Sequence, residues 1–305
     1  MTPETYRGYR VAIVGGCQTA GLAEWIRRLL PGAEVRNWHA DTAPAAILEV
    51  AQQIAGSDLV VTQFSDDMDA GALEVTRLRE HFANVVFMPV LVFAGFHPDI
   101  ACCGLAHQPF AFIRGPLDIL QSTISLAAYH LDLRASRVPR LYNSLTFEAL
   151  GYVGAFAGAR AAFLDVFAAH GYGLADAFDG WMRDGCFMYS DNHPHIRVLG
   201  SFARLILGKA GLPAAVAATS ETPADGLADS VHWPVYPALG RPIGIAGSTV
   251  FTRAAHGVPA SEARELTLQA FVEASYRVFA AVGRERLDRV PRVARATETL
   301  RSLLA

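Results

Sequence analysis

The stretch Arg10-Val-Ala-Ile-Val-Gly-Gly-Cys-Gln-Thr19, near the beginning of the chain, combines an apolar run with two glycines and a cysteine. A short apolar run that ends in glycine is typical of a buried strand leaving a sheet. Apolar residues then recur at helical spacing from Leu22 to Leu30, where Pro31 and Gly32 stop the pattern. The stretch therefore predicts a strand, a tight turn that contains Cys17, and a helix.

The same alternation continues along the first third of the chain. Strands are predicted over residues 33–38, 57–63 and 84–88, with helices over 43–54 and 70–81. The third strand is apolar along its whole length, as expected for a sheet covered on both faces. Strands that alternate with helices favour a parallel sheet with right-handed crossovers. We expect an α/β fold, a doubly wound parallel sheet (Rossmann/flavodoxin-like), over residues 8–95.

Beyond about residue 115 the pattern is helical almost throughout. Helices are predicted over residues 116–133, 141–169, 174–183, 196–212, 260–283 and 290–304. Short extended segments are expected at Cys186–Ser190 and Pro242–Thr252. The expected organisation is an α/β region over residues 1–114 and a mainly helical region over residues 115–305 that packs against it.

Composition excludes several classes of protein. The 305 residues carry 26 Lys and Arg against 29 Asp and Glu, a net charge of -3, which does not suit a general nucleic-acid binder. No apolar run reaches the roughly 20 residues that a membrane span needs. The four cysteines contain no CxxC pair and no zinc spacing, which fits a reducing compartment. The beginning of the chain has no apolar leader core, so we expect a cytoplasmic protein without a membrane span.

Polar residues follow the predicted strands, where ligands bind to open parallel sheets. Gly15, Gly16, Cys17 and Gln18 follow the first strand, and Gln63 ends the third. His97 comes after the apolar run of the fourth strand, so three clusters are expected on one rim. The glycines do not fit the GxGxxG or Walker spacing, which disfavours nicotinamide and nucleoside triphosphate chemistry.

Cys17 lies where a helix begins, and free backbone N–H groups there favour a thiolate. A nucleophilic thiol is one interpretation, and a small buried apolar residue is the other. A partner base is offered by His193, with Asp191 to orient its ring. The alternative is that the segment 190–192 caps the next helix. A metal held by His193 and His195 is disfavoured, because no third ligand is evident.

Phosphate binding would fall mainly to arginine, since Lys209 is the only lysine. Arg197 is one candidate, although nothing in its local sequence separates it from Arg114 or Arg160.

Taken in order, the quoted elements resemble the WcbI-type polysaccharide-biosynthesis proteins. The resemblance is carried by Val11–Gln18, the strand that ends in Gln63, Gly95–Asp99, and Asp191–Pro194 followed by a helix. It implies a coenzyme A-dependent acetyltransferase that uses acetyl-coenzyme A to modify a sugar hydroxyl in capsule or other surface-polysaccharide assembly.

Carried over to this chain, the resemblance gives each motif a role. Cys17 with Gln18 would form the reactive turn, Gln63 and His97 would line the site, and His193 would be the acid or base. The residues expected to bind coenzyme A are Gly15, Gly16, Gln18, Gln63, His97 and Arg197. Gly16 stands where the family usually has Asn. The alternatives are a thiol-based esterase or deacylase, similar to hydrolases with a nucleophile on the first strand-to-helix turn, and a non-catalytic protein that binds coenzyme A or another ligand.

Overall fold

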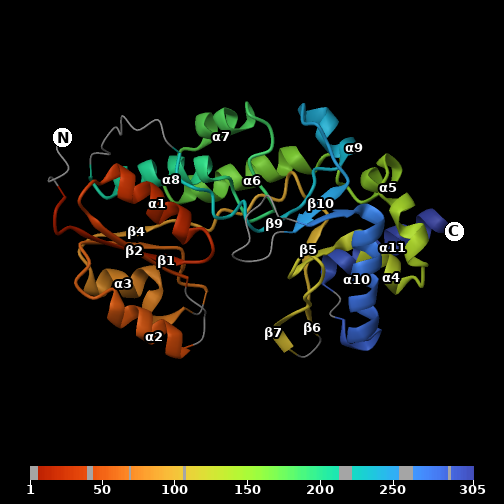
Figure 1. Ribbon diagram of the computed structural model, residues 1–305, viewed down its shortest axis with the longest axis horizontal. Helices are drawn as coiled ribbons and strands as arrows, with labels where there is room; N and C mark the ends of the chain where they lie inside the picture. The colour runs from red at the N-terminus through yellow and green to blue at the C-terminus, as the bar shows by residue number, and fades with distance from the viewer. Residues whose placement is uncertain are drawn as a thin grey trace. The chain divides into compact units, whose positions relative to one another are not determined.

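The computed structural model describes residues 6–39, 44–68, 70–105, 108–212, 222–253, 264–287 and 290–305 (Figure 1). They form two compact units, each assembled from separate segments. The first unit contains the chain up to Val92, Ala162–Phe187 and Asn192–Leu227. The second contains Phe93–Ala161, Met188–Asp191 and Ala228–Ala305.

The first unit is built on a parallel sheet of four strands in the order β2-β1-β3-β4. The strands are β1 (Arg10–Gly15), β2 (Glu34–His39), β3 (Leu59–Thr62) and β4 (Val85–Phe87). β1 is central: Val11 pairs with Val35 on one side and with Leu59 on the other. All four residues of β3 are buried, as its apolar sequence predicts. The expected α/β class is confirmed.

Helices cover both faces of this sheet (Figure 1). α1 (Thr19–Leu29) and α8 (Ile196–Lys209) lie on one face, and α2 (Pro44–Gln53) and α3 (Val75–His81) lie on the other. A 3₁₀ turn, Gly71–Leu73, precedes α3 where one continuous helix was predicted. The sheet is therefore wound on both sides, and one of its covering helices comes from far along the chain.

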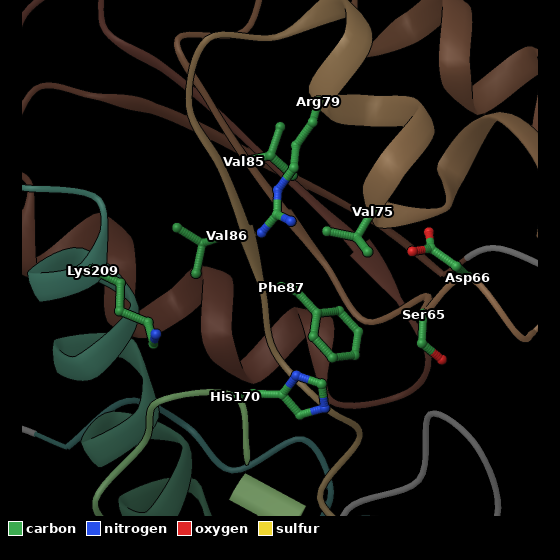
Figure 2. Close-up of a pocket in the computed structure, with 9 residues that line it drawn as sticks. All are labelled: Ser65, Asp66, Val75, Arg79, Val85, Val86, Phe87, His170 and Lys209. Atoms are coloured by element: carbon green, nitrogen blue, oxygen red, sulfur yellow. The ribbon is translucent and has the colours of Figure 1, made fainter. Parts of the chain in front are cut away.

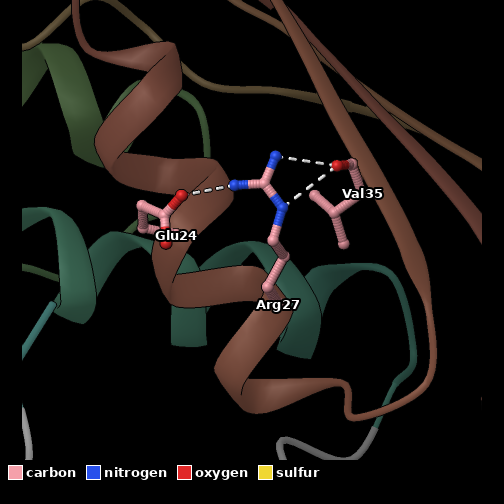
Figure 3. Close-up of polar contacts among 3 residues, drawn as sticks. All are labelled: Glu24, Arg27 and Val35. Atoms are coloured by element: carbon pink, nitrogen blue, oxygen red, sulfur yellow. Dashed lines mark hydrogen bonds and ion pairs between the residues drawn. The ribbon is translucent and has the colours of Figure 1, made fainter.

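α1 is fixed both to the sheet and to α8. Arg27 donates from Nε and Nη2 to the carbonyl of Val35 in β2, at 3.2 and 2.9 Å, and from Nη1 to Glu24 (Figure 3). The Trp25 indole donates to the carbonyl of Ile196 at 2.7 Å. The apolar face of α1 and the first turn of α8 thus form one packed layer.

Aromatic side chains fill the rest of the first unit. Phe163 and Phe167, in the second part of α6 (Ala155–Ala169), pack with α7 (Ala175–Met182) and α8. Their ring centroids lie 4.7 Å apart, and the Phe167 and Phe202 centroids are 5.0 Å apart. α7 confirms the helix predicted over residues 174–183. The single helix predicted over residues 141–169 is wrong, because the chain forms α5 (Ser144–Ala149) and α6, with Gly151 at a positive φ of 74° between them.

The second unit mixes helices with short antiparallel strands. Two of its sheets are pairs, β5 (Ile100–Cys102) with β8 (Leu120–Ser122) and β6 (Gly104–Leu105) with β7 (Gln108–Phe112). In a third sheet β10 (Val250–Arg253) lies between β9 (Val231–His232) and β11 (Arg264–Thr267). Its helices are α4 (Thr123–His130), α5 (Ser144–Ala149), α9 (Pro237–Gly240), α10 (Leu268–Val282) and α11 (Pro291–Leu304), with 3₁₀ turns at Ala135–Leu141, Arg241–Ile243 and Arg284–Arg286. The stacked rings of Phe251 and Phe271, 4.1 Å apart, lie in its core.

Some predicted elements of this unit need correction. The helix predicted over residues 116–133 contains strand β8 before α4 begins. The helix predicted over residues 260–283 contains strand β11 before α10, and its residues 260–263 lie outside the described part of the chain. The segment Cys186–Ser190 forms no strand. Leu120–Ser122 is buried along its whole length, and a short apolar run of this kind has no period that separates a strand from a helix.

The contact between α1 and α8 gives a test of the first unit. A Cβ added at Gly200 would lie 2.6 Å from Cε2 of Trp25, and the hydrogen bond to Ile196 holds this indole in place. Overpacking costs about 1–3 kcal/mol, more than the roughly 1 kcal/mol of helix propensity that Ala offers. We expect Gly200→Ala to lower the free energy of unfolding, measured with denaturant.

Gly208 of the same helix is the matched control, because a Cβ there meets nothing within 4 Å. We expect Gly208→Ala to be neutral or to stabilise by up to about 1 kcal/mol. Equal effects of the two substitutions would contradict this packing of α1 on α8.

Candidate functional site

Cys17 lies in the turn between the central strand β1 and α1. Thr19 closes this turn, donating its hydroxyl and its backbone N–H to the carbonyl of Gly16 at 2.9 and 3.2 Å. The Cys17 thiol is partly exposed and forms no disulfide. The N-terminal end of a helix favours negative charge. Cys17 therefore lies in the turn at the carboxyl edge of the sheet, as predicted, and its role as a thiolate stays a prediction.

Two buried glutamines hold the turn, and we call Gln18 and Gln63 the glutamine pair. Gln63 donates to Oε1 of Gln18 at 3.1 Å and accepts from the Gly16 N–H at 3.1 Å. Gln18 also accepts from the N–H of Leu91 at 3.1 Å and donates to the Leu91 carbonyl at 2.8 Å. Gln18 is 0% and Gln63 1% exposed. Both side chains position the turn, and their contact with a cofactor stays a prediction.

The second amide hydrogen of Gln18 joins the turn to the segment 191–195, which contains His193 and His195 and which we call the histidine segment. The Nε2 of Gln18 donates to the carbonyl of Asn192 at 2.9 Å, and His193 is the next residue. His195 directly precedes α8, and its N–H donates to the carbonyl of Phe187 at 2.9 Å. The structure thus brings together, within the first unit, the neighbours of Cys17 and His193, which are far apart in the sequence.

The two glycines of the turn have different surroundings. A Cβ at Gly15 would lie 2.4 Å from Oε1 of Gln63, so only glycine fits there without moving the glutamine pair. A Cβ at Gly16 would meet nothing within 4 Å. In the described part of the chain, the N–H of Gln18 donates no hydrogen bond. The turn therefore offers open space and an available donor beside the thiol.

His97 and Asp191 belong to the second unit. The carbonyl of Asp191 accepts from the N–H of Phe93 at 2.6 Å. His97 is only 1% exposed, and burial lowers the pKa of its imidazole to about 3, opposed in part by the backbone of Trp233. His97 is therefore neutral at pH 7. The predicted roles of Asp191 in orienting the base and of His97 in lining the site stay predictions.

Asp99, two residues after His97, is the centre of a buried network that the local sequence did not reveal. Its carboxylate accepts from the N–H of Ile124, near the start of α4, and from the Tyr236 hydroxyl, both at 3.0 Å. Burial raises the pKa of Asp99 to about 6, opposed by the hydrogen bonds it accepts. Asp99 therefore caps α4, a helix that begins more than twenty residues further along the chain.

Arg197 already has partners within the first unit. Its guanidinium donates to the Asp184 carboxylate at 2.8 Å and to the carbonyl of Trp181 at 3.0 Å. These bonds direct the side chain to α7 and the turn after it. Its predicted contact with a phosphate stays a prediction.

The described residues contain no group of three or more His, Cys, Asp or Glu side chains that would hold a metal ion. None of their helices combines the length and the apolar character needed to cross a bilayer.

Comparison with known proteins gives one match, and it is long. The family described as polysaccharide biosynthesis enzyme WcbI matches residues 10–215, which contain the Cys17 turn, the glutamine pair and the His193 segment. The chain belongs to the WcbI family. No curated protein and no solved structure matches it. Membership of the WcbI family makes the chain a polysaccharide biosynthesis enzyme, and the resemblance stated from its motifs is confirmed.

The glycines of the turn provide a matched pair of variants. We expect Gly15→Ala to lower the free energy of unfolding by about 1–3 kcal/mol, because its Cβ overlaps the Gln63 side chain. Gly16→Ala has open space and should change it by less than about 0.5 kcal/mol. Denaturant unfolding measures both. A larger loss for Gly16→Ala than for Gly15→Ala would show that the turn is packed differently.

His97 and Asp99 predict a pH dependence of stability with opposite signs. The pKa of His97 is about 3 in the folded chain against an ordinary 6.5, so its contribution to stability falls as the pH drops below 6.5. The pKa of Asp99 is raised from 3.8 to about 6, so its contribution rises as the pH drops from 6 to 3.8. The two effects oppose each other between about pH 4 and pH 6.

His97→Gln removes the first effect and leaves the second. Between pH 6 and pH 4 we expect the difference in unfolding free energy between the native chain and this variant to change by up to about 1.4 kcal/mol per pH unit. Denaturant unfolding at several pH values measures it. His81→Gln, at an exposed position, is the control. Parallel curves for the native chain and His97→Gln would show that His97 is not buried as described.

Proposed function

We propose that this WcbI-family enzyme is a coenzyme A-dependent acetyltransferase that transfers an acetyl group to a sugar hydroxyl during capsule or surface-polysaccharide biosynthesis. The observation that carries the proposal is the 2.9 Å hydrogen bond from Gln18 to the carbonyl of Asn192. It joins the neighbour of a partly exposed thiol to the neighbour of a histidine. A thiol and an imidazole are the groups that nucleophilic acyl transfer needs.

The reaction breaks the carbon–sulfur bond of a thioester and forms an ester bond to the sugar oxygen. In one route His193 takes the proton of the Cys17 thiol and the resulting thiolate attacks the acetyl carbonyl. Coenzyme A then leaves as its thiol with the proton that His193 returns. The sugar hydroxyl then attacks the acyl-cysteine while His193 takes its proton, and the Cys17 thiolate leaves. In the other route His193 removes the proton of the sugar hydroxyl, whose oxygen attacks the thioester directly, and coenzyme A leaves as its thiol with that proton.

The turn has features that suit the negative charge that develops on the carbonyl oxygen. The N–H of Gln18 donates no hydrogen bond in the described part of the chain, and the space above Gly16 is open. Backbone donors fixed in advance stabilise such an oxyanion without reorganising. The glutamine pair supports this role by holding the Gly16 N–H and the start of α1 in place.

Intact-mass measurement after mixing with acetyl-coenzyme A separates the two routes. We expect an acetyl adduct on the native chain and none on Cys17→Ala, with acetyl transfer to a sugar acceptor reduced by about 100-fold or more. The control is Cys186→Ala, because Cys186 is another partly exposed, disulfide-free cysteine of the first unit. Undiminished transfer by Cys17→Ala would exclude the acyl-cysteine route.

His193→Ala tests the base in both routes. Transfer should fall by about 100-fold or more while binding of acetyl-coenzyme A is kept. Hydrolysis of acyl esters without any need for coenzyme A would instead identify a thiol esterase. Binding of coenzyme A with no transfer to any sugar would identify a non-catalytic protein.

A further inference from the structure

A groove runs along the free edge of the sheet in the first unit, beside the edge strand β4 (Figure 2). Its volume is about 460 Å³. That volume lies within the range of roughly 300–1,000 Å³ that is typical of small-molecule sites. Its lining comes from β4, from the loop after β3, from α3, from the residue after α6 and from the end of α8.

Two cationic side chains enter this groove from different elements. Arg79 reaches in from α3 and Lys209 from the end of α8 (Figure 2). In the described part of the chain, neither forms an ion pair or a side-chain hydrogen bond. The Lys209 ammonium lies 4.6 Å from the centroid of the Tyr172 ring, which holds it without neutralising it. Positive charge at the groove is therefore available to a ligand.

Asp66 is the acidic residue of the groove lining, and its carboxylate is already occupied. Its two oxygens accept from the N–H of Thr76 at 2.9 Å and from the Thr76 hydroxyl at 2.6 Å. These hydrogen bonds lower the pKa of Asp66, and the charge of Arg79 adds to the effect. Asp66 therefore leaves the groove with two positive charges against one negative charge.

Aromatic rings form the neighbouring part of the lining. The rings of Phe87 and His170 meet edge to face, with centroids 4.8 Å apart. The Tyr172 hydroxyl donates to the carbonyl of Phe87 at 2.7 Å, which fixes the end of β4. A ring edge and a ring face beside two cations suit a ligand that carries both a heterocycle and phosphate groups.

We propose that this groove binds the phosphate groups of a nucleotide through Arg79 and Lys209, with the base against Phe87 and His170. Resting on the proposed function, the same nucleotide would belong to a substrate of the Cys17 turn. Ser65 lines the groove two residues after Gln63, whose side chain holds that turn. The chemistry fits two sources: the nucleotide of the acyl donor and the nucleotide of an activated sugar.

Calorimetry on the full chain tests the groove with two separate probes, adenosine 3′,5′-bisphosphate for the acyl donor and uridine diphosphate for an activated sugar. We expect one of them to bind, more weakly as salt is raised. Arg79→Gln and Lys209→Gln should each weaken its binding by about 10-fold or more, because each removes a charged donor. The probe that binds identifies the source.

Arg77→Gln is the matched control, since Arg77 lies on the same helix as Arg79 but pairs with Glu80 and does not line the groove. It should leave the affinity unchanged. Binding of neither probe, or equal affinities of the native chain and both groove variants, would overturn the proposal.

The readout also separates this proposal from the proposed function. If nucleotide binding is lost in the groove variants but the native chain transfers no acetyl group, the groove binds a nucleotide and the proposed acetyltransferase activity is wrong. Acetyl transfer whose KM for the donor and the acceptor is unchanged in both groove variants would reject the groove and leave the transferase.

Discussion

The first unit depends on the hydrogen bonds of one buried side chain, Gln18. Its amide donates to the carbonyls of Leu91 and Asn192 and accepts from the N–H of Leu91 and the amide of Gln63. Leaving one of these partners buried without a hydrogen bond would cost about 1–3 kcal/mol. The turn after β1, the segment after β4 and the start of the histidine segment therefore hold their positions together.

This constraint has a consequence for the chemistry of the turn. The glutamine pair fixes the backbone on both sides of Cys17, so under the proposed function the thiol and the nearby N–H groups would need little reorganisation when a substrate binds. Gly15 is required so that the Gln63 side chain can lie against the strand. Gly16 has no such requirement, and the space above it is open. Packing demands one glycine, and the other leaves room beside the thiol.

The sequence predicted what depends on local pattern and missed what depends on distant partners. The apolar run before Cys17 was enough to place β1, the turn and α1, because burial dictates its composition. Cofactor binding by Gln18 stays a prediction, and what the sequence missed is that its side chain bonds to groups 45, 73 and 174 residues away. No local pattern reveals such partners. The return of α8 to cover the first sheet beside α1 was hidden for the same reason.

Whether a cationic side chain of this protein can bind a ligand depends on the groups it already contacts, and not on the number of cations in the chain. Nearly all of its cations are arginines, and several of them serve the fold: Arg27 donates to Val35, Arg197 to Asp184 and Arg284 to Asp132. An arginine whose donors are already used loses those bonds if it turns to a ligand. In the described part of the chain Arg79 and Lys209 have no such bonds to lose, and both line the groove at the free edge of β4, so their charge there is open to an anion.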